Sequence, residues 1–352
     1  MASRFRTEKS HARTGLSGWK NDCARTRNPV EDLPMDFAVS TRWNASRHSD
    51  GAAMVEEILA LGVNRLELGY DTRIDLLPGL EEFQREEKIT IDSVHNYCPV
   101  PMGVPRGHPE LWTFADLDRR GHDMAVQHTL RTLEFAAEMG ARIVVIHCGY
   151  VHLKKTSTRD LMQLIQMNQQ NSPRYEKTFM KFVKERDKRA PKHFDQVCRA
   201  LDALLPKAAE LGVQLGLENL PTAEAVPNEG EMELLVQKYQ TPFLKYWHDL
   251  GHGQIRENLG FINHVRWLER LAPALGGMHI HDVADRLQDH VMPPDGELGL
   301  ARFAPFASQD IPLVMEPSPR ATPEEMAAGL AWVRHWWDDG PEPTPRPPLA
   351  EE

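Results

Sequence analysis

The sequence predicts a parallel (β/α)8 barrel in a single domain, because eight short apolar runs alternate with stretches long enough for a helix. Each run carries a polar or ionisable residue at or near its end, and in such a barrel every strand delivers its end to one rim. A chain of 352 residues is within the size of these barrels. The expected strands cover residues 36–41, 65–69, 89–95, 142–147, 213–218, 244–249, 277–282 and 312–317.

We expect the barrel to occupy residues 35–339. Residues 1–34 lack hydrophobic periodicity, which predicts a disordered leader or a start codon upstream of a natural start at Met35. The Pro-rich tail, residues 340–352, is also expected to be unstructured. The longest interruption follows the fourth strand, where residues 151–193 form a basic, partly helical insertion. Insertions after barrel strands lie over the rim, so this one is a candidate lid.

Composition favours a soluble protein of the cytoplasm. Hydrophobic residues make up 41% of the chain, enough for a sizeable core, and no apolar run approaches the ~18 residues that a membrane helix needs. The four cysteines are widely spaced, with no CxxC pair, and no signal-type apolar segment follows the first methionine. These features together predict a reducing compartment.

Charge is distributed unevenly along the chain. Residues 1–30 carry a net charge of +5 and residues 151–193 carry +7, so the rest carries −22 because the whole chain carries −10. A strongly acidic body argues against broad binding of duplex DNA, and we expect no nucleic-acid partner. The basic insertion could still meet an anionic substrate.

Three carboxylates end apolar strands, at Glu218, Asp249 and Glu316. Such a carboxylate is costly to bury without a partner. One of them could be a solvated residue at the start of a loop, but three at the ends of three strands are less readily explained in that way. One imidazole would complete a ligand set for a single divalent ion, Mn2+ before Co2+, Mg2+ or Zn2+. Because residues two apart on a strand share a face, the residues themselves leave His279 and His281 as alternatives.

Two motifs carry a family resemblance. Residues 247–252 (WHDLGH) resemble the DxGH motif, and residues 279–282 (HIHD) the HxND motif, of the xylose isomerase-like barrel superfamily. The resemblance covers roughly residues 35–337. The superfamily includes sugar isomerases and epimerases, inosose dehydratases and type IV apurinic endonucleases. It implies His279 rather than His281 as the ligand, so that the four metal ligands are Glu218, Asp249, His279 and Glu316.

The same resemblance implies an alternative function, that of a multi-zinc phosphoesterase like the type IV endonucleases. Residues 94–97 look like their VHxxY strand end and residues 145–149 like their VxHPG motif. It implies additional metal or substrate contacts at His95, His147, His252 and His290. One position departs from the pattern, since Gln288 stands where an Asp is expected, although Asp289 is adjacent. The missing carboxylate puts a third zinc in doubt, because neighbouring dications need anionic ligands.

We therefore expect a divalent-metal-dependent isomerase or epimerase that acts on a small sugar or sugar phosphate. Glu218 and Glu316 would face each other as catalytic bases and move a proton through a metal-bound enediolate. An inosose-type dehydratase would use the same metal and the same acidic carbon. A barrel that binds a sugar without turning it over would have no need for two opposed bases.

Other residues of the rim are expected to contact the substrate. Glu67 ends the second strand, and Trp43 could either stack on a sugar face or pack under a loop. Glu224 follows Glu218 by six residues, as a helper Glu does in the ketose 3-epimerases. Arg286 lies after the seventh strand, near the usual phosphate position of barrels. Related barrels often dimerise over this rim, which leaves a homo-oligomer open.

Overall fold

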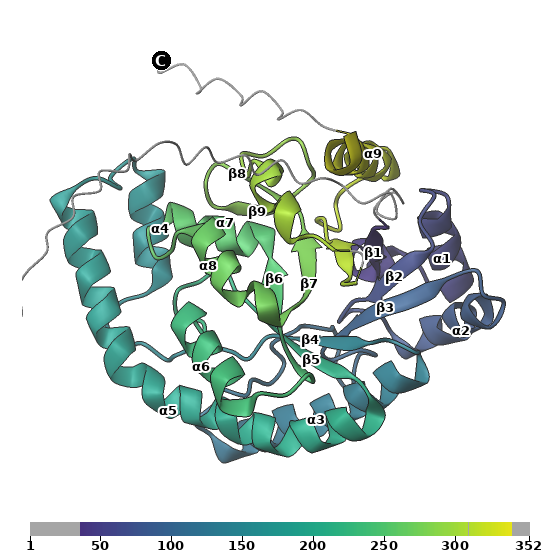
Figure 1. Cartoon of the computed structure of the whole chain (residues 1–352), viewed down its shortest axis with the longest axis horizontal. Helices are drawn as coiled ribbons and strands as arrows, with labels where there is room; N and C mark the ends of the chain where they lie inside the picture. Colours follow the sequence, from purple (N-terminus) through teal and green to yellow (C-terminus); the bar gives the residue numbers. More distant parts are fainter. Residues whose placement is uncertain (1–35, 309, 340–352) are drawn as a thin grey trace, which may run out of the picture. The chain divides into compact units, whose positions relative to one another are not determined.

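The computed structural model describes residues 36–308 and 310–339, all of which fall in one compact unit. Parallel strands lie at the centre of the molecule (Figure 1), and eight of them close a barrel in the order β1-β10-β7-β6-β5-β4-β3-β2, which confirms the predicted (β/α)8 fold. The predicted leader and Pro-rich tail lie outside the described residues. The barrel strands are β1 (Ala38–Ser40), β2 (Arg65–Leu68), β3 (Thr90–His95), β4 (Ile143–Ile146), β5 (Gln214–Glu218), β6 (Leu244–Asp249), β7 (Leu275–Ile280) and β10 (Leu313–Met315).

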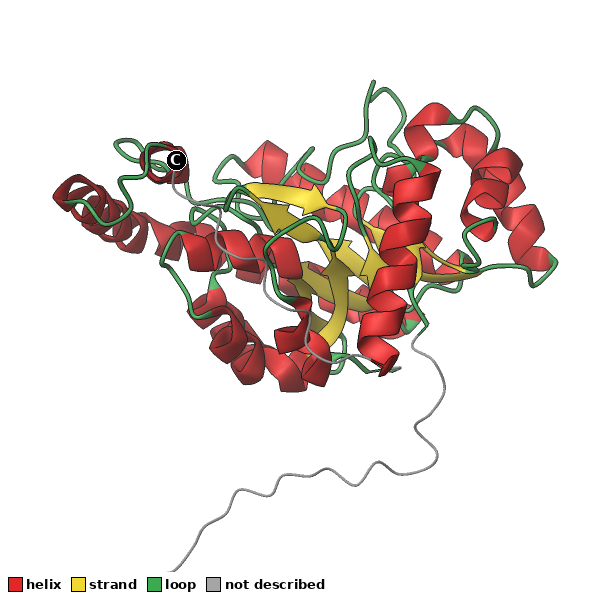
Figure 2. Ribbon diagram, turned by 90° about the horizontal axis from the view of Figure 1, so that it is seen from above, coloured by secondary structure: helices red, strands yellow, loops and turns green. Residues whose placement is uncertain are grey.

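Helices surround these strands (Figure 2), and buried side chains fill the space between the two layers. Several helices begin at a residue that caps them: the side chains of Asp50 and Asp118, for example, accept hydrogen bonds from the first turns of α1 and α3. In the described part of the chain, no helix is both long and apolar enough to span a membrane. The helices are α1 (Gly51–Leu59), α2 (Leu77–Arg85), α3 (Arg119–Glu138), α4 (Thr158–Gln166), α5 (Pro173–Leu211), α6 (Glu229–Tyr239), α7 (Leu250–Asn258), α8 (His264–Leu271) and α9 (Pro323–Asp339).

The seventh strand lies two residues earlier in the chain than predicted, from Leu275 to Ile280. The apolar run was taken to start at Gly277, but the two preceding residues also pair as strand. Gly277 is needed there because a Cβ would lie 2.1 Å from Cζ3 of Trp247, which fills the barrel interior. After Ile280 the chain leaves the barrel and forms an antiparallel hairpin of β8 (Asp282–Ala284) and β9 (Gln288–Val291).

The segment after β4 contains α4 and the first half of α5. Leu161 of α4 and Phe182 of α5 belong to a buried cluster that also contains Ile255 of α7 and Val283 of β8. Both α7 and β8 follow the carboxyl ends of barrel strands, so this segment packs against the rim that carries the site. Its motion as a lid remains a prediction.

Candidate metal centre

Four strands bring the predicted ligands Glu218, Asp249, His279 and Glu316 together at the carboxyl end of the barrel. Nδ1 of His279 lies 3.2 Å from Oε1 of Glu218, 3.2 Å from Oε2 of Glu316 and 3.7 Å from Oδ2 of Asp249. All four side chains are buried. Ligands bound at about 2.1 Å to one ion lie about 3 Å apart, so these donor atoms have the spacing that a single ion requires.

Glu67 fixes the orientation of His279. Nε2 of His279 lies 3.1 Å from both carboxylate oxygens of Glu67, and Oγ of Ser93 donates to Oε2 of Glu67 at 2.8 Å. Glu67 is fully buried. The predicted substrate contact at Glu67 is therefore replaced by a structural one, in which the carboxylate directs Nδ1 of His279 toward the other ligands.

Imidazoles surround Glu218 on both sides of its carboxylate. Its Oε2 lies 3.0 Å from Nε2 of His147 and 3.4 Å from Nε2 of His95. Its Oε1 lies 3.2 Å from Nδ1 of His279 and 3.4 Å from Nδ1 of His252. Glu218 is thus shared between the central group and a second group of possible donors, formed with His95 and His147.

A loop residue that the sequence did not single out, Glu110, supports His147 from behind. Its Oε1 lies 3.0 Å from Nδ1 of His147, and the hydroxyl of Tyr150 also donates to it. Burial would raise the pKa of Glu110, but the bonds from His147 and Tyr150 lower it. Glu110 holds Nε2 of His147 toward Glu218 as a carboxylate behind a metal-binding histidine does.

His252, His281 and His290 form a third group at the edge of the site. The rings of His281 and His290 are stacked, with centroids 4.2 Å apart. Asp289 accompanies them, with Oδ2 3.7 Å from Nε2 of His252 and Oδ1 3.2 Å from Nδ1 of His290. The hairpin β8–β9 therefore brings two polar side chains back over the rim.

The buried carboxylates of the centre raise the pKa values of the histidines beside them. Burial would lower the pKa of His279, but Glu316, Glu67 and Glu218 raise it well above its usual range. The pKa of His147 is likewise raised to about 10: burial would lower it, but Glu218 and then Glu110 outweigh that effect. A dication would supply the charge that these protons otherwise supply, so the donor set fits a divalent metal.

Arg42 and Glu316 lie on the side of the site opposite the imidazoles that surround Glu218, and we call these two sides the walls of the site. Nε of Arg42 lies 3.8 Å from Oε1 of Glu316 and donates to the hydroxyl of Tyr70, while Nη1 donates to the carbonyl oxygen of Pro317 at 3.2 Å. The Arg42 side chain keeps 17% of its surface exposed, against 5% for Glu316. Arg42 follows the first strand directly and was missed because no motif includes it.

Three predicted substrate contacts lie elsewhere. Trp43 is fully buried and its indole N–H donates to the carbonyl of Ala321 at 2.8 Å, so it packs under a loop. The carboxylate of Glu224 accepts from the amide and the hydroxyl of Thr158 and anchors the start of α4. Arg286 is exposed at the β8–β9 turn. The structure brings none of the three side chains to the central group.

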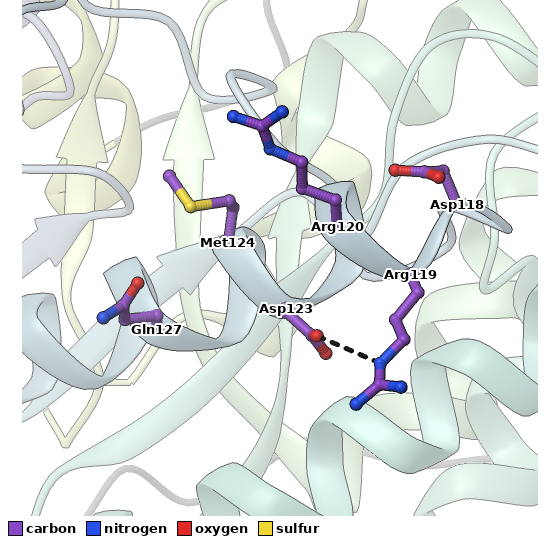
Figure 3. A pocket seen from close by; sticks show the side chains of 6 residues that line it. All are labelled: Asp118, Arg119, Arg120, Asp123, Met124 and Gln127. Atoms are coloured by element: carbon purple, nitrogen blue, oxygen red, sulfur yellow. Dashed lines mark ion pairs between the residues drawn. The ribbon is translucent and has the colours of Figure 1, made fainter.

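A separate surface hollow of about 420 Å³ lies at the start of α3 (Figure 3). Its charged side chains include Arg119 and Asp123, which form an ion pair at 3.4 Å. None of the three donor groups contributes a residue to this hollow, so it is distinct from the metal centre.

Known structures share this fold. A D-tagatose 3-epimerase-like protein aligns with a TM-score of 0.61 at 16% identity, over 87% of this chain and 98% of its own. The apo form of 3-keto-D-glucoside 4-epimerase from E. coli gives 0.61 at 18% identity, over 85% and 99%. The IOLI protein, with a binding zinc atom, gives 0.58 at 13% identity, over 86% and 98%. No curated protein matches the chain.

A family model also matches the sequence. The model is described as a xylose isomerase-like TIM barrel and matches residues 55–336, from the first helix to the last. This agrees with the resemblance carried by residues 247–252 and 279–282. The chain therefore belongs to the xylose isomerase-like TIM barrel family.

Proposed function

We propose that the protein is a divalent-metal-dependent sugar isomerase or epimerase that acts by proton transfer. The observation that carries this proposal is the buried group of three carboxylates and one imidazole, with donor atoms 3.2 to 3.7 Å from Nδ1 of His279. Two proteins of this fold, a D-tagatose 3-epimerase-like protein and a 3-keto-D-glucoside 4-epimerase, support the choice of substrate class.

Glu218, Asp249, His279 and Glu316 would hold the metal. When bound, a divalent ion there polarises a substrate carbonyl and makes the proton on the neighbouring carbon acidic. Mn2+, Co2+, Mg2+ and Zn2+ all accept carboxylate oxygens, and the single imidazole favours the transition ions among them.

The surroundings of the two glutamates support different roles for them. Both oxygens of Glu218 lie within 3.4 Å of two imidazole nitrogens each, so neither is free to meet a substrate proton. Oε1 of Glu316 lies 3.8 Å from Nε of Arg42, a longer contact than any of these, and the Arg42 side chain is 17% exposed. We therefore assign Glu316 as the proton-transfer base and Glu218 as a ligand, which revises the sequence-based pairing of two opposed bases.

Arg42 would orient the substrate at this wall. Its guanidinium is permanently charged and can donate to a substrate oxygen next to the carbon that Glu316 deprotonates. A single base returns the proton on the face from which it was taken, which suits isomerisation between neighbouring carbons better than inversion at one carbon. An epimerase would need a further proton donor on the opposite face.

The test is a panel of aldoses, ketoses and their phosphates, incubated in D2O with metal-loaded protein and followed by NMR. We expect a product with solvent deuterium on the carbon that received the proton, and turnover about 10² to 10⁴ times slower in Glu316→Gln. Absence of deuterium incorporation from every member of the panel would contradict the proposal, and loss of water from an inositol-like ring would indicate a dehydratase.

A multi-metal phosphoesterase is the second candidate. It is favoured by one observation, the two histidine-rich groups that adjoin the central one. It predicts metal-dependent cleavage of a simple diester such as bis(p-nitrophenyl) phosphate, and this cleavage would depend on His95 and His147. The net charge of −10 weighs against a nucleic-acid substrate.

A further inference from the structure

We propose that His281 is a positioning residue that fixes the ligand Asp249 and ties the β8–β9 hairpin to the metal centre. This inference rests on the proposed role of Asp249 in holding a metal. His281 stands where the HxND motif has Asn, two residues after the ligand His279 on the same face of the chain.

Hydrogen bonding decides which nitrogen of His281 carries the proton. The backbone amide of His290 points at Nδ1 of His281 from 2.9 Å, and an amide can only donate. The carbonyl of Asp282 also lies 3.3 Å from Nδ1, but a proton on Nδ1 would collide with the closer amide hydrogen. Nδ1 is therefore the unprotonated nitrogen and Nε2 carries the proton.

The protonated Nε2 then has one role. It lies 2.9 Å from Oδ2 of Asp249 and donates to it, which leaves His281 no lone pair for an ion. This arrangement repeats the Glu67–His279 pair with the roles of carboxylate and imidazole exchanged. Partners of this kind, one step behind the ligands, orient the ligands and influence metal affinity.

Packing holds the His281 ring in place. The ring is fully buried and stacks on that of His290. A Cβ at Gly251 would lie 2.0 Å from Cε1 of His281, so the glycine of residues 247–252 makes room for this histidine. The ring thus connects the Asp249 carboxylate to the backbone of His290, whose own side chain lies 3.6 Å from Glu316.

Two substitutions separate the two bonds of His281. The amide nitrogen of Gln can take the place of Nε2 and keep the bond to Asp249, while the amide oxygen of Asn can take the place of Nδ1 and keep the bond from His290. The experiment measures the dissociation constant for Mn2+ by titration of metal-free protein. It also measures hydrogen exchange at the His290 amide by NMR of the metal-free, 15N-labelled protein.

We expect His281→Asn to weaken Mn2+ binding about 10- to 100-fold with slow exchange retained at the His290 amide. We expect His281→Gln to bind Mn2+ within about tenfold of the wild type, with faster exchange at that amide. The matched control is His193→Gln. His193 is another buried histidine that accepts an amide, from His152, and faces a carbonyl, of Ala115, but lies outside the three donor groups.

Equal Mn2+ affinities in the wild type and His281→Asn, or unchanged exchange at His290 in His281→Gln, would overturn the inference. The exchange measurement needs no metal. A protein that binds none of Mn2+, Co2+, Mg2+ and Zn2+ would therefore contradict the proposed function, while the behaviour of the His290 amide would still decide whether His281 accepts its bond.

Discussion

The two walls of the site present their carboxylates differently. On the β4–β6 side, Glu218 is enclosed by imidazoles and its side chain is 1% exposed. On the β1–β10 side, Glu316 lies beside Arg42, and their side chains are 5% and 17% exposed. A carboxylate whose oxygens are fully engaged is suited to hold an ion, whereas one with an accessible oxygen beside a cation is suited to exchange a proton with a substrate. In the proposed function both glutamates hold the ion, and Glu316 also transfers the proton.

Removal of the charge at Glu218 should have the largest effect. In Glu218→Gln the imidazoles of two donor groups lose the anion that they share, so we expect metal binding and turnover to be lost together. Metal content after dialysis, measured beside activity, checks this. A variant that keeps its metal and loses only turnover would show that the distinction between the walls is wrong.

The Glu316→Gln variant should lose turnover more than metal. General-base catalysis contributes about 10² to 10⁴ in rate, so kcat should fall by that factor. Asp249, His279 and Glu218 remain as ligands, so metal affinity should fall less than in Glu218→Gln. Titration of both variants with the same ion gives the comparison, and equal losses of affinity would contradict it.

Replacing Arg42 tests whether the wall that contains Glu316 contacts the substrate. Arg42→Gln removes a charged donor beside Glu316 but no ligand, so we expect KM to rise and metal content to stay unchanged. Steady-state kinetics on the substrate found in the panel measures this. Unchanged KM and kcat would remove Arg42 from the substrate contacts.

Glu110→Gln tests support two steps behind the ligand Glu218, because Glu110 contacts His147 and His147 contacts Glu218. Loss of the charge behind His147 should weaken metal binding about 10-fold, at the low end of the range for such partners. The measurement is the same metal titration. An effect as large as that of Glu218→Gln would mean that the group containing His95 and His147 is essential, as the phosphoesterase candidate requires.

A buried histidine pair behind β6 should make stability depend on pH. Burial lowers the pKa of His248 to about 3 and that of His264 well below its usual value, and their Nε2 atoms lie 2.9 Å apart. Below pH ~6.5 these two histidines take up protons in the unfolded chain but not in the folded one, so their contribution to stability falls as pH falls.

Each such histidine costs about 2 kcal/mol between pH 7 and pH 5. In His264→Gln one of the two is removed, and the urea midpoint of the metal-free variant should therefore fall less over this interval than that of the wild type. Parallel pH profiles for the two proteins would contradict the assignment.

The barrel and the clustering of the four predicted ligand residues could be predicted because strand ends in this topology meet at one rim. Glu218 and Asp249 end apolar runs, and no knowledge of loop paths is needed to bring them together. His279 required the family resemblance, since strand periodicity alone could not separate it from His281.

The rest of the site depends on loops. Arg42 and Glu110 reach the centre from loops after β1 and β3, and no periodic pattern in the sequence encodes those paths. For the same reason Trp43, Glu224 and Arg286 were assigned to the substrate although each one has another partner or faces solvent. Their spacing from strand ends was right for the rim, but side-chain direction decides contact.

Metal content per chain is the most direct test of a single metal centre built on Glu218. Protein purified without chelator or added metal would be analysed by mass spectrometry, beside Glu218→Gln and the control His193→Gln. We expect about one divalent ion per chain in the wild type and the control, and none in Glu218→Gln. Two or three zinc ions per chain, lost also on replacement of His95 and His147, would contradict it in favour of a multi-metal phosphoesterase.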